Sequence, residues 1–252
     1  NAQGYSTMGA LVSGASLVLV DRFSASRFWE QIRHYKATIF NYIGAMMYIL
    51  NKQPESEKDR EHHVRAAYGT PSFDKEFHDY LEKRFGIKMV SGYGLTECGV
   101  CLIQPMGDNQ KTKSMGIPKQ IPGADFTNEV RVVDENDRPV AANTVGEIVI
   151  RNPAVMKGYY RDPELTREVM RNGWLHTGDF AWMDEDGFFY FADRKKHVIR
   201  RRGENVSSIE VENVLNAHPD ILESAVIGVP SEVYDDEVKA FIVPRSEKTP
   251  DP

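Results

Sequence analysis

Three polar segments of the chain combine residue types suited to a phosphorylated ligand. The first, SGYGLTE at residues 91–97, brings an aromatic ring, a hydroxyl and a carboxylate into a glycine-rich stretch. Glycine lets backbone approach a ligand closely, a flat ring suits a purine, and a carboxylate oxygen suits Mg²⁺. We therefore predict that a glycine-rich bend here contacts a nucleotide, although an ordinary turn at a strand end has a similar composition.

The second segment, GWLHTGD at residues 173–179, places a carboxylate beside a glycine bend. One carboxylate accepts hydrogen bonds from two hydroxyls, so Asp179 suits a vicinal diol. Taken alone, the segment is better explained by an aspartate that caps a turn.

The third segment, DRKK at residues 193–196, is basic, and Arg200 and Gly203 follow it closely. Basic runs usually form solvated faces. This run lies at the apparent boundary between two domains, and that placement favours contacts to phosphate or ribose.

The hydrophobic pattern before residue 105 predicts alternating strands and helices. Residues 17–20, 38–40 and 65–68 read as strands, and helices are predicted from about Ser26 and Ser72. This order predicts a partly parallel α/β layer.

After about residue 105 the sequence predicts a different pattern of secondary structure. Short strands near residues 130–133, 147–150 and 188–191, set around polar turns, indicate a β-rich subdomain over about residues 106–193, in which Asp162 is predicted to cap a helix. A capping box of Ser207 and Glu210 then opens a helix, and strands near 225–229 and 239–243 follow. The predicted fold is therefore α/β and α+β: part of a large N-terminal domain over residues 1–193, then the start of a small α+β domain over 194–252.

Composition narrows the class of protein. The 252 residues include 41% hydrophobic residues and carry a net charge of −6, as in a globular protein without the basic face that nucleic acid requires. No apolar run approaches the roughly 20 residues of a membrane span, and we recognise no signal peptide. The two cysteines, Cys98 and Cys101, make no disulfide framework, so we expect a cytoplasmic protein.

Several other residues predict structure rather than chemistry. The CxxC spacing of the two cysteines lacks a second pair for zinc, so we interpret them as packed thiols. Trp29, Met46 and Met47 are predicted to lie in the core. His62 and His63 are predicted to be solvated.

Four ordered segments together resemble one family. They are YGLTE at 93–97, GEIVI at 146–150 with KGYY at 157–160, WLHTGD at 174–179, and DRKK through Gly203. They resemble the signatures of the acyl-adenylate-forming (AMP-binding) superfamily, which includes acyl-CoA synthetases, luciferases and peptide-synthetase adenylation domains. The resemblance runs in register to about residue 244. Residues 1–29 and 203–207 look most similar to the crotonobetaine/carnitine-CoA ligase branch.

The resemblance implies a role for each matching residue. It implies that Tyr93 stacks on adenine, Thr96 contacts the α-phosphate and Glu97 binds Mg²⁺. Asp179, assisted by Arg194, would bind the ribose hydroxyls. The remaining nucleotide-binding positions that it implies are Gly69, Thr70 (where the family usually has Ala), Pro71, Ser91, Gly92 and Gly94.

At the C-terminal side, the resemblance implies a hinge at Lys196 between two half-reactions. Arg200 and Gly203 fall where the thioester-forming face meets the pantetheine tunnel, and Glu204 lies beside them. The implied reaction joins a small carboxylic acid to coenzyme A, with ATP and Mg²⁺, through an acyl-adenylate.

Two alternatives stay open. An adenylation domain that loads a carrier protein is disfavoured by Leu95, because such domains usually have Pro there. A chain that binds nucleotide without turnover is the other alternative. The sequence does not identify the acid and leaves the oligomeric state open, a homo-oligomer included.

Two family features are not found in this sequence: the phosphate loop that ends in Lys and the C-terminal lysine. Residues 9–14 have similar glycine spacing, but Ala15 stands where a lysine is needed. We therefore expect that this stretch of chain alone is inactive.

Overall fold

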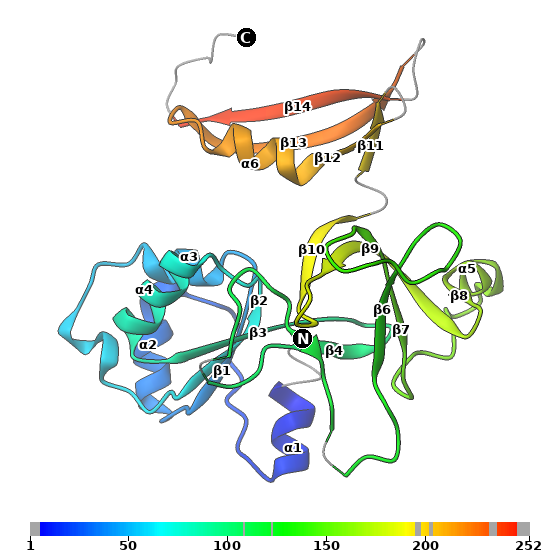
Figure 1. Ribbon diagram of the computed structural model, residues 1–252. Coiled ribbons are helices and arrows are strands. Elements are labelled where there is room, and N and C mark those ends of the chain that lie inside the picture. The colour runs from blue at the N-terminus through cyan, green and yellow to red at the C-terminus, as the bar shows by residue number, and fades with distance from the viewer. Residues whose placement is uncertain are drawn as a thin grey trace. The chain divides into compact units, whose positions relative to one another are not determined.

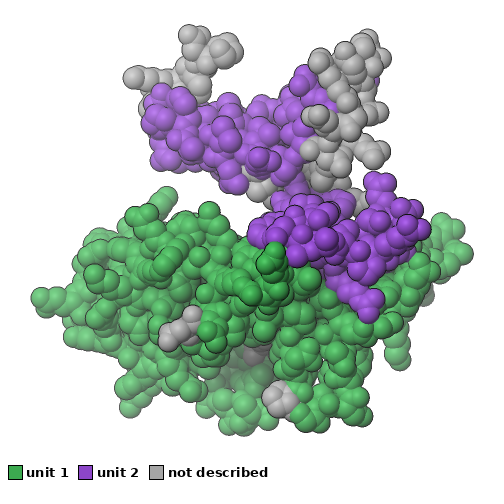
Figure 2. Space-filling view, in the orientation of Figure 1, with its two compact units in different colours: residues 1–130, 150–175, 183–190 green, residues 131–149, 176–182, 191–252 purple. Residues whose placement is uncertain are grey.

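The computed structural model describes residues 6–107, 109–121, 123–194, 198–201, 204–231 and 236–245 (Figure 1). The chain divides into two compact units, which Figure 2 colours separately. The first comprises residues 1–130, 150–175 and 183–190, and the second comprises 131–149, 176–182 and 191–252.

The first sheet is partly parallel, as the sequence predicts. Its strands follow the order β1 (Ile39–Ile43), β2 (Ala66–Thr70), β3 (Lys88–Leu95), β4 (Gly99–Ile103) and β5 (Ile117–Pro118). The first three strands are parallel, and β4 and β5 add antiparallel pairs. Phe40, Ala67 and Met89 lie in register and are all buried, so this face of the sheet belongs to the core.

Helices of the same segment add buried side chains to this core. The helices of the segment are α1 (Gly9–Ser13), α2 (Ala25–His34), α3 (Met46–Asn51), the 3-10 helix η2 (Glu57–Arg60) and α4 (Lys75–Phe85). Trp29 of α2, Met47 of α3 and Leu81 of α4 are buried in one cluster with the sheet, which confirms the predicted core positions of Trp29 and Met47. Helix α4 is capped by Asp74, whose side chain accepts a hydrogen bond from Phe77 N at 2.9 Å.

Two predictions about this region are wrong. Residues 15–20 form no strand, and the apolar side chains of residues 17–20 are between 40% and 86% exposed. An apolar run becomes a strand only where a neighbouring strand offers hydrogen bonds, and no described strand pairs with this segment. His62 is half-buried rather than solvated, because its ring stacks on Trp29 with centroids 4.8 Å apart, whereas His63 is exposed as predicted.

The second sheet has the order β10 (Phe189–Arg194), β9 (Trp174–Met183), β7 (Gly146–Arg151) and β6 (Glu129–Val133), and the short β8 (Met170–Arg171) pairs with β9. The strands predicted near residues 130–133, 147–150 and 188–191 are confirmed. Helix α5 (Pro163–Val169) begins after Asp162, whose Oδ1 accepts from Leu165 N at 2.9 Å, so the predicted cap is also confirmed.

The C-terminal elements are two antiparallel pairs and a helix. Strand β11 (Val198–Arg201) pairs with β12 (Glu204–Ser207), and β13 (Ile221–Pro230) pairs with β14 (Asp236–Pro244). Between these pairs, α6 (Ser208–Asn216) is capped by Ser207, whose Oγ accepts from Glu210 N at 3.3 Å. The predicted domain boundary near residue 193 stays a prediction.

Among the described helices, none is long and apolar enough to cross a membrane.

Candidate functional site

Two predicted segments lie together at the carboxyl ends of parallel strands. Gly69 and Thr70 end β2, and Gly69 is in register with Ser91 of β3. A Cβ at Gly69 would overlap the carbonyl oxygen of Tyr42, so β1 and β2 can approach this closely only at a glycine. Thr70 and Pro71 are exposed and are joined by a cis peptide bond. Ligands of open α/β sheets bind outside such carboxyl ends, so this edge suits a ligand.

The SGYGLTE segment is mostly strand rather than a free bend. Residues 91–95 belong to β3, and only residues 96–98 form the turn into β4. A Cβ at Gly92 would lie 2.7 Å from Tyr68 Oη, and one at Gly94 would overlap the carbonyl oxygen of Gly99. These two glycines are therefore required by the packing of the hairpin, whereas Thr96 is exposed at its turn.

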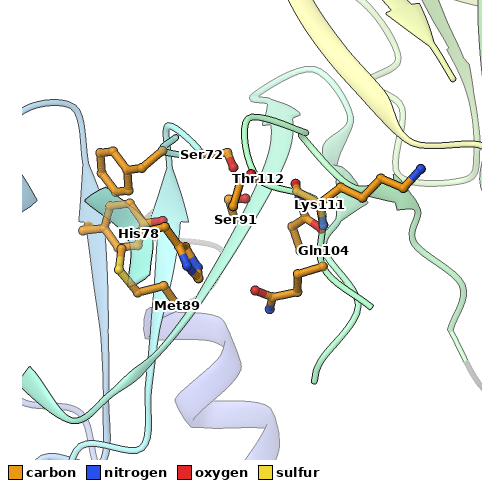
Figure 3. A pocket seen from close by; sticks show the side chains of 10 residues that line it. Ser72, His78, Met89, Ser91, Gln104, Lys111 and Thr112 are labelled. Carbon is orange, nitrogen blue, oxygen red and sulfur yellow. The ribbon is translucent and has the colours of Figure 1, made fainter. Parts of the chain in front are cut away.

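Ser91 faces a narrow pocket within the first unit. The pocket is lined by residues of β1, β3, α4 and the segment after β4, and Figure 3 shows Ser91 near Ser72 and Thr112 there. Ser91 is buried, and its hydroxyl donates to the carbonyl oxygen of Ser114 at 3.4 Å. The side chain of Gln104 closes the same region with bonds to the carbonyl oxygens of Lys111 and Ser114 at 2.6 and 2.9 Å. Ser91 thus has a structural contact that the sequence did not predict.

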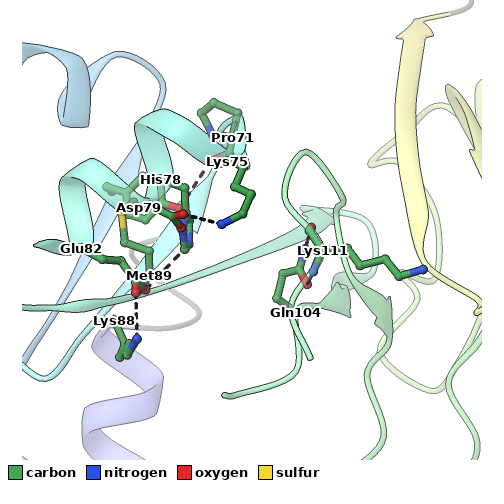
Figure 4. Close-up of polar contacts among 10 residues, drawn as sticks. Pro71, Lys75, His78, Asp79, Glu82, Lys88, Met89, Gln104 and Lys111 are labelled. Carbon is green, nitrogen blue, oxygen red and sulfur yellow. Dashed lines mark hydrogen bonds and ion pairs between the residues drawn. The ribbon is translucent and has the colours of Figure 1, made fainter. Parts of the chain in front are cut away.

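Helix α4 fixes the beginning of the strand that carries Tyr93. Glu82 Oε1 accepts from the backbone N of Met89 at 2.8 Å, and its Oε2 accepts from Lys88 Nζ at 2.9 Å (Figure 4). His78 Nε2 lies 3.8 Å from Glu82 Oε1 on the same helix face. The position of β3 is therefore set by a carboxylate as well as by the sheet.

The side chain of Glu97 meets the KGYY segment. Tyr159 Oη donates to Glu97 Oε1 at 2.9 Å, and Met156 N donates to the Glu97 carbonyl oxygen at 2.6 Å. Burial and the neighbouring Glu97 carboxylate raise the pKa of Tyr159 above its usual value, so the phenol stays a donor. Tyr159 is a residue to which the sequence assigned no role, although it stands within a recognised signature.

Asp179 and Arg194, predicted to act together, are an ion pair. Arg194 Nε lies 3.0 Å from Asp179 Oδ1; the aspartate is buried, and half of the arginine side chain is exposed. Thr177 fixes the backbone of β9 next to Asp179, because its hydroxyl donates to the Ile148 carbonyl oxygen at 2.8 Å and accepts from Asp179 N at 3.1 Å. A buried carboxylate beside an accessible guanidinium can receive hydroxyl donors from a ligand.

The remaining predicted residues lie at the edge of what the structure describes. Lys196 and Gly203 are outside the described residues. Arg200 lies in β11 opposite Asn205, and Glu204 lies in β12 opposite Arg201; only the backbone of these two predicted residues is described.

Both cysteines are buried free thiols, which confirms their predicted packing. Cys101 Sγ lies 3.6 Å from the carbonyl oxygen of Tyr93, so this thiol contacts the backbone of the predicted adenine-binding residue. The neighbouring Cys98 and burial raise the pKa of the Cys101 thiol, which keeps it protonated.

The chain belongs to the AMP-binding enzyme family, because the sequence model of that family matches residues 1–160 and the model of its C-terminal domain matches residues 210–252. Among its relatives, the crotonobetaine/carnitine–CoA ligase of Salmonella heidelberg (strain SL476) is 37% identical over 99% of this chain and 48% of its own length. The chain therefore spans about half the length of the curated relatives it matches.

Solved structures agree with this assignment. ATP-bound MatB from Rhodopseudomonas palustris superposes with a TM-score of 0.84 and 26% identity, covering 100% of this chain and 49% of that one. The amide bond synthetase McbA from Marinactinospora thermotolerans gives a TM-score of 0.78 and 28% identity over 98% and 51%. The predicted family and the predicted α/β and α+β fold class are confirmed.

Proposed function

We propose that the full-length protein is an ATP-dependent ligase that joins a small carboxylic acid to coenzyme A through an acyl-adenylate. The observation that carries this proposal is the 37% identity to a CoA ligase over 99% of the chain. The buried Asp179 with its Arg194 partner, and Glu97 held by Tyr159, supply groups suited to a nucleotide.

Nucleotide recognition is proposed residue by residue. Tyr93 and the Gly69–Thr70–Pro71 edge contact adenine, and the exposed Thr96 hydroxyl donates to the α-phosphate. Asp179 accepts hydrogen bonds from the ribose hydroxyls, with Arg194 beside it. Exposure of Thr70, Pro71 and Thr96 at the end of the sheet supports these roles.

The donor set suits Mg²⁺ bound together with substrate. No group of three or more His, Cys, Asp or Glu side chains that could hold a metal exists among the described residues. Mg²⁺ is commonly bound by one or two carboxylates together with substrate phosphates and water, which fits the single carboxylate of Glu97. When bound, the ion offsets phosphate charge.

The proposed reaction has two displacements. A carboxylate oxygen of the acid attacks the α-phosphorus of ATP, and the bond to pyrophosphate breaks. The thiol of coenzyme A, on losing its proton, then attacks the acyl carbon and displaces AMP. Lys196 would be the hinge between the two steps, and Arg200, Gly203 and Glu204 would face coenzyme A. We place the reaction in the cytoplasm, where free thiols such as Cys98 and Cys101 persist.

A carboxylic-acid panel on the full-length protein tests this function. Pyrophosphate release is measured with ATP and Mg²⁺, separately with coenzyme A and with a carrier protein, and the thioester is identified by mass spectrometry. The panel includes crotonobetaine and carnitine because of the relatives' names. We expect acid-dependent pyrophosphate and an acyl-CoA product. A product formed only on the carrier protein, or AMP binding without any turnover, would replace the proposal with one of the alternatives.

A further inference from the structure

Glu147 lies in β7 and makes two hydrogen bonds to the strand that carries Asp179. Its Oε1 accepts from Gly178 N at 3.0 Å, and its Oε2 lies 3.1 Å from His176 Nδ1. Glu147 and His176 are both buried, and all these residues belong to the second compact unit. Burying a carboxylate costs free energy unless it is hydrogen-bonded. The hydrogen bonds to both Glu147 oxygens offset this cost.

The two bonds reach β9 at His176 and at Gly178, on either side of Thr177. A carboxylate only accepts hydrogen bonds, so His176 Nδ1 carries the proton in this pair. Its other ring nitrogen, Nε2, lies 3.7 Å from Asp137 Oδ1. The His176 ring therefore lies between carboxylates from two segments, and its hydrogen bond to Glu147 orients it.

Gly178 makes a kink within strand β9. Its φ of 70° is in the left-handed region that favours glycine, and Glu147 receives its N–H. The next backbone N–H, that of Asp179, is received by Thr177 Oγ1. Because Thr177 also donates to the Ile148 carbonyl oxygen, two consecutive residues of β7 hold the backbone of β9 on both sides of this kink.

We infer that Glu147 is a positioning residue for nucleotide recognition: it fixes the Gly178 backbone so that the Asp179 carboxylate is presented to the ribose hydroxyls. The inference rests on the proposed function of Asp179. Glu147 does not touch the ligand, and it acts through the backbone of β9 at Gly178. An apolar residue of similar size would fill the same volume in β7 but would leave Gly178 N–H without its acceptor.

The test measures ribose discrimination in the full-length protein. The ratio of kcat/KM for ATP to that for 2′-deoxy-ATP reports how well Asp179 meets the 2′-hydroxyl. Glu147→Leu should lower this ratio by about 5- to 30-fold, the range for one or two lost polar interactions. Glu147→Gln should keep most of the ratio, because its amide oxygen still accepts from Gly178 N. The KM for coenzyme A should stay unchanged.

A matched control is Glu129→Leu. Glu129 lies in the same sheet and accepts two bonds from Arg151 at 2.8 Å each, on a more exposed face. Its replacement should leave the ATP to 2′-deoxy-ATP ratio unchanged. If Glu147→Leu does not fold, Glu147→Asp decides, because its carboxylate is one methylene too short to span both partners.

A folded Glu147→Leu or Glu147→Asp protein with an unchanged ratio would overturn the inference. In an Asp179→Ala background, Glu147→Leu should have no further effect on the ratio, and an additional loss there would also overturn it. If no acid supports turnover, the proposed function fails separately. Binding of AMP and 2′-deoxy-AMP, measured by calorimetry, then supplies the same ratio without catalysis.

Discussion

Tyr159 Oη donates to Glu97 Oε1 at 2.9 Å and joins residues that are 62 positions apart in the sequence. The bond fixes one oxygen of the carboxylate proposed to bind Mg²⁺. The orientation of Glu97 therefore depends on a residue from a different signature of the family.

Removing this hydroxyl should weaken the response to Mg²⁺. Tyr159→Phe should raise the Mg²⁺ concentration for half-maximal pyrophosphate release about 5- to 10-fold, because a hydrogen bond to a charged group is lost. Tyr160→Phe is the control, since this neighbouring side chain is 85% exposed. Identical Mg²⁺ titrations for the two variants would show that Tyr159 does not affect Mg²⁺ binding by Glu97.

Asp179→Ala should weaken AMP binding by about 1–3 kcal/mol, the range for hydrogen bonds to a charged group. Calorimetry on the full-length protein measures this. Asp125→Ala replaces an exposed aspartate and should leave the affinity unchanged. Unchanged AMP affinity in Asp179→Ala would exclude this residue from the ribose site.

His62 should make stability depend on pH in the weakly acidic range. Burial against Trp29 lowers the pKa of His62 below its usual 6.5, and Val64 N donates to its Nδ1 at 3.2 Å. The unfolded chain therefore takes up the proton first as the pH falls. The contribution of His62 is complete above pH 6.5 and is lost below it.

Thermal unfolding of the full-length protein at pH 7.5 and 5.5 measures this contribution. His62→Phe should reduce the fall in Tm between the two pH values, because the phenyl ring keeps the stacking on Trp29 and takes up no proton. His63→Phe, at an exposed position, should leave the fall as it is in the wild type. An equal pH response in both variants would contradict the assignment.

Arg84 should be a large contributor to stability. Its side chain is 5% exposed and bonds Asp59 Oδ2 at 2.9 Å and the carbonyl oxygens of Asn51 and Gln53 at 2.6 and 2.8 Å. Breaking a buried ion pair from one side costs about 3–5 kcal/mol, so Arg84→Met should lower Tm strongly. Lys83→Met, at the exposed neighbouring position, should change Tm little, and equal shifts would show that the network is unimportant.

Local features of the fold were predictable because their hydrogen bonds span few residues. The caps at Asp162 and Ser207 each bond a backbone N–H three residues ahead, so the sequence pattern contains both partners. The apolar run at residues 17–20 was misleading, because burial of such a run depends on a strand elsewhere in the chain.

The candidate site was predictable in its residue types and not in its contacts. Asp179 and Arg194 came from the family resemblance, and the structure pairs them. Glu147 and His176 are 29 residues apart, and their bond depends on which residues β7 and β9 bring opposite one another. Strand register of this kind is decided by tertiary packing, which a single sequence does not contain.

The buried thiols give the protein an internal reporter of motion. Cys98 is 1% exposed and ends the hairpin turn that carries Glu97, and Cys101 is 0% exposed and lies in β4 just after that turn. An alkylating reagent reaches them only when this hairpin opens. The rate of labelling of the peptide around residues 98–101 therefore measures how often the hairpin opens. Peptide mass spectrometry would measure this labelling rate in the wild-type protein. A slower labelling rate in the presence of AMP would show how far the ligand reduces opening of the hairpin.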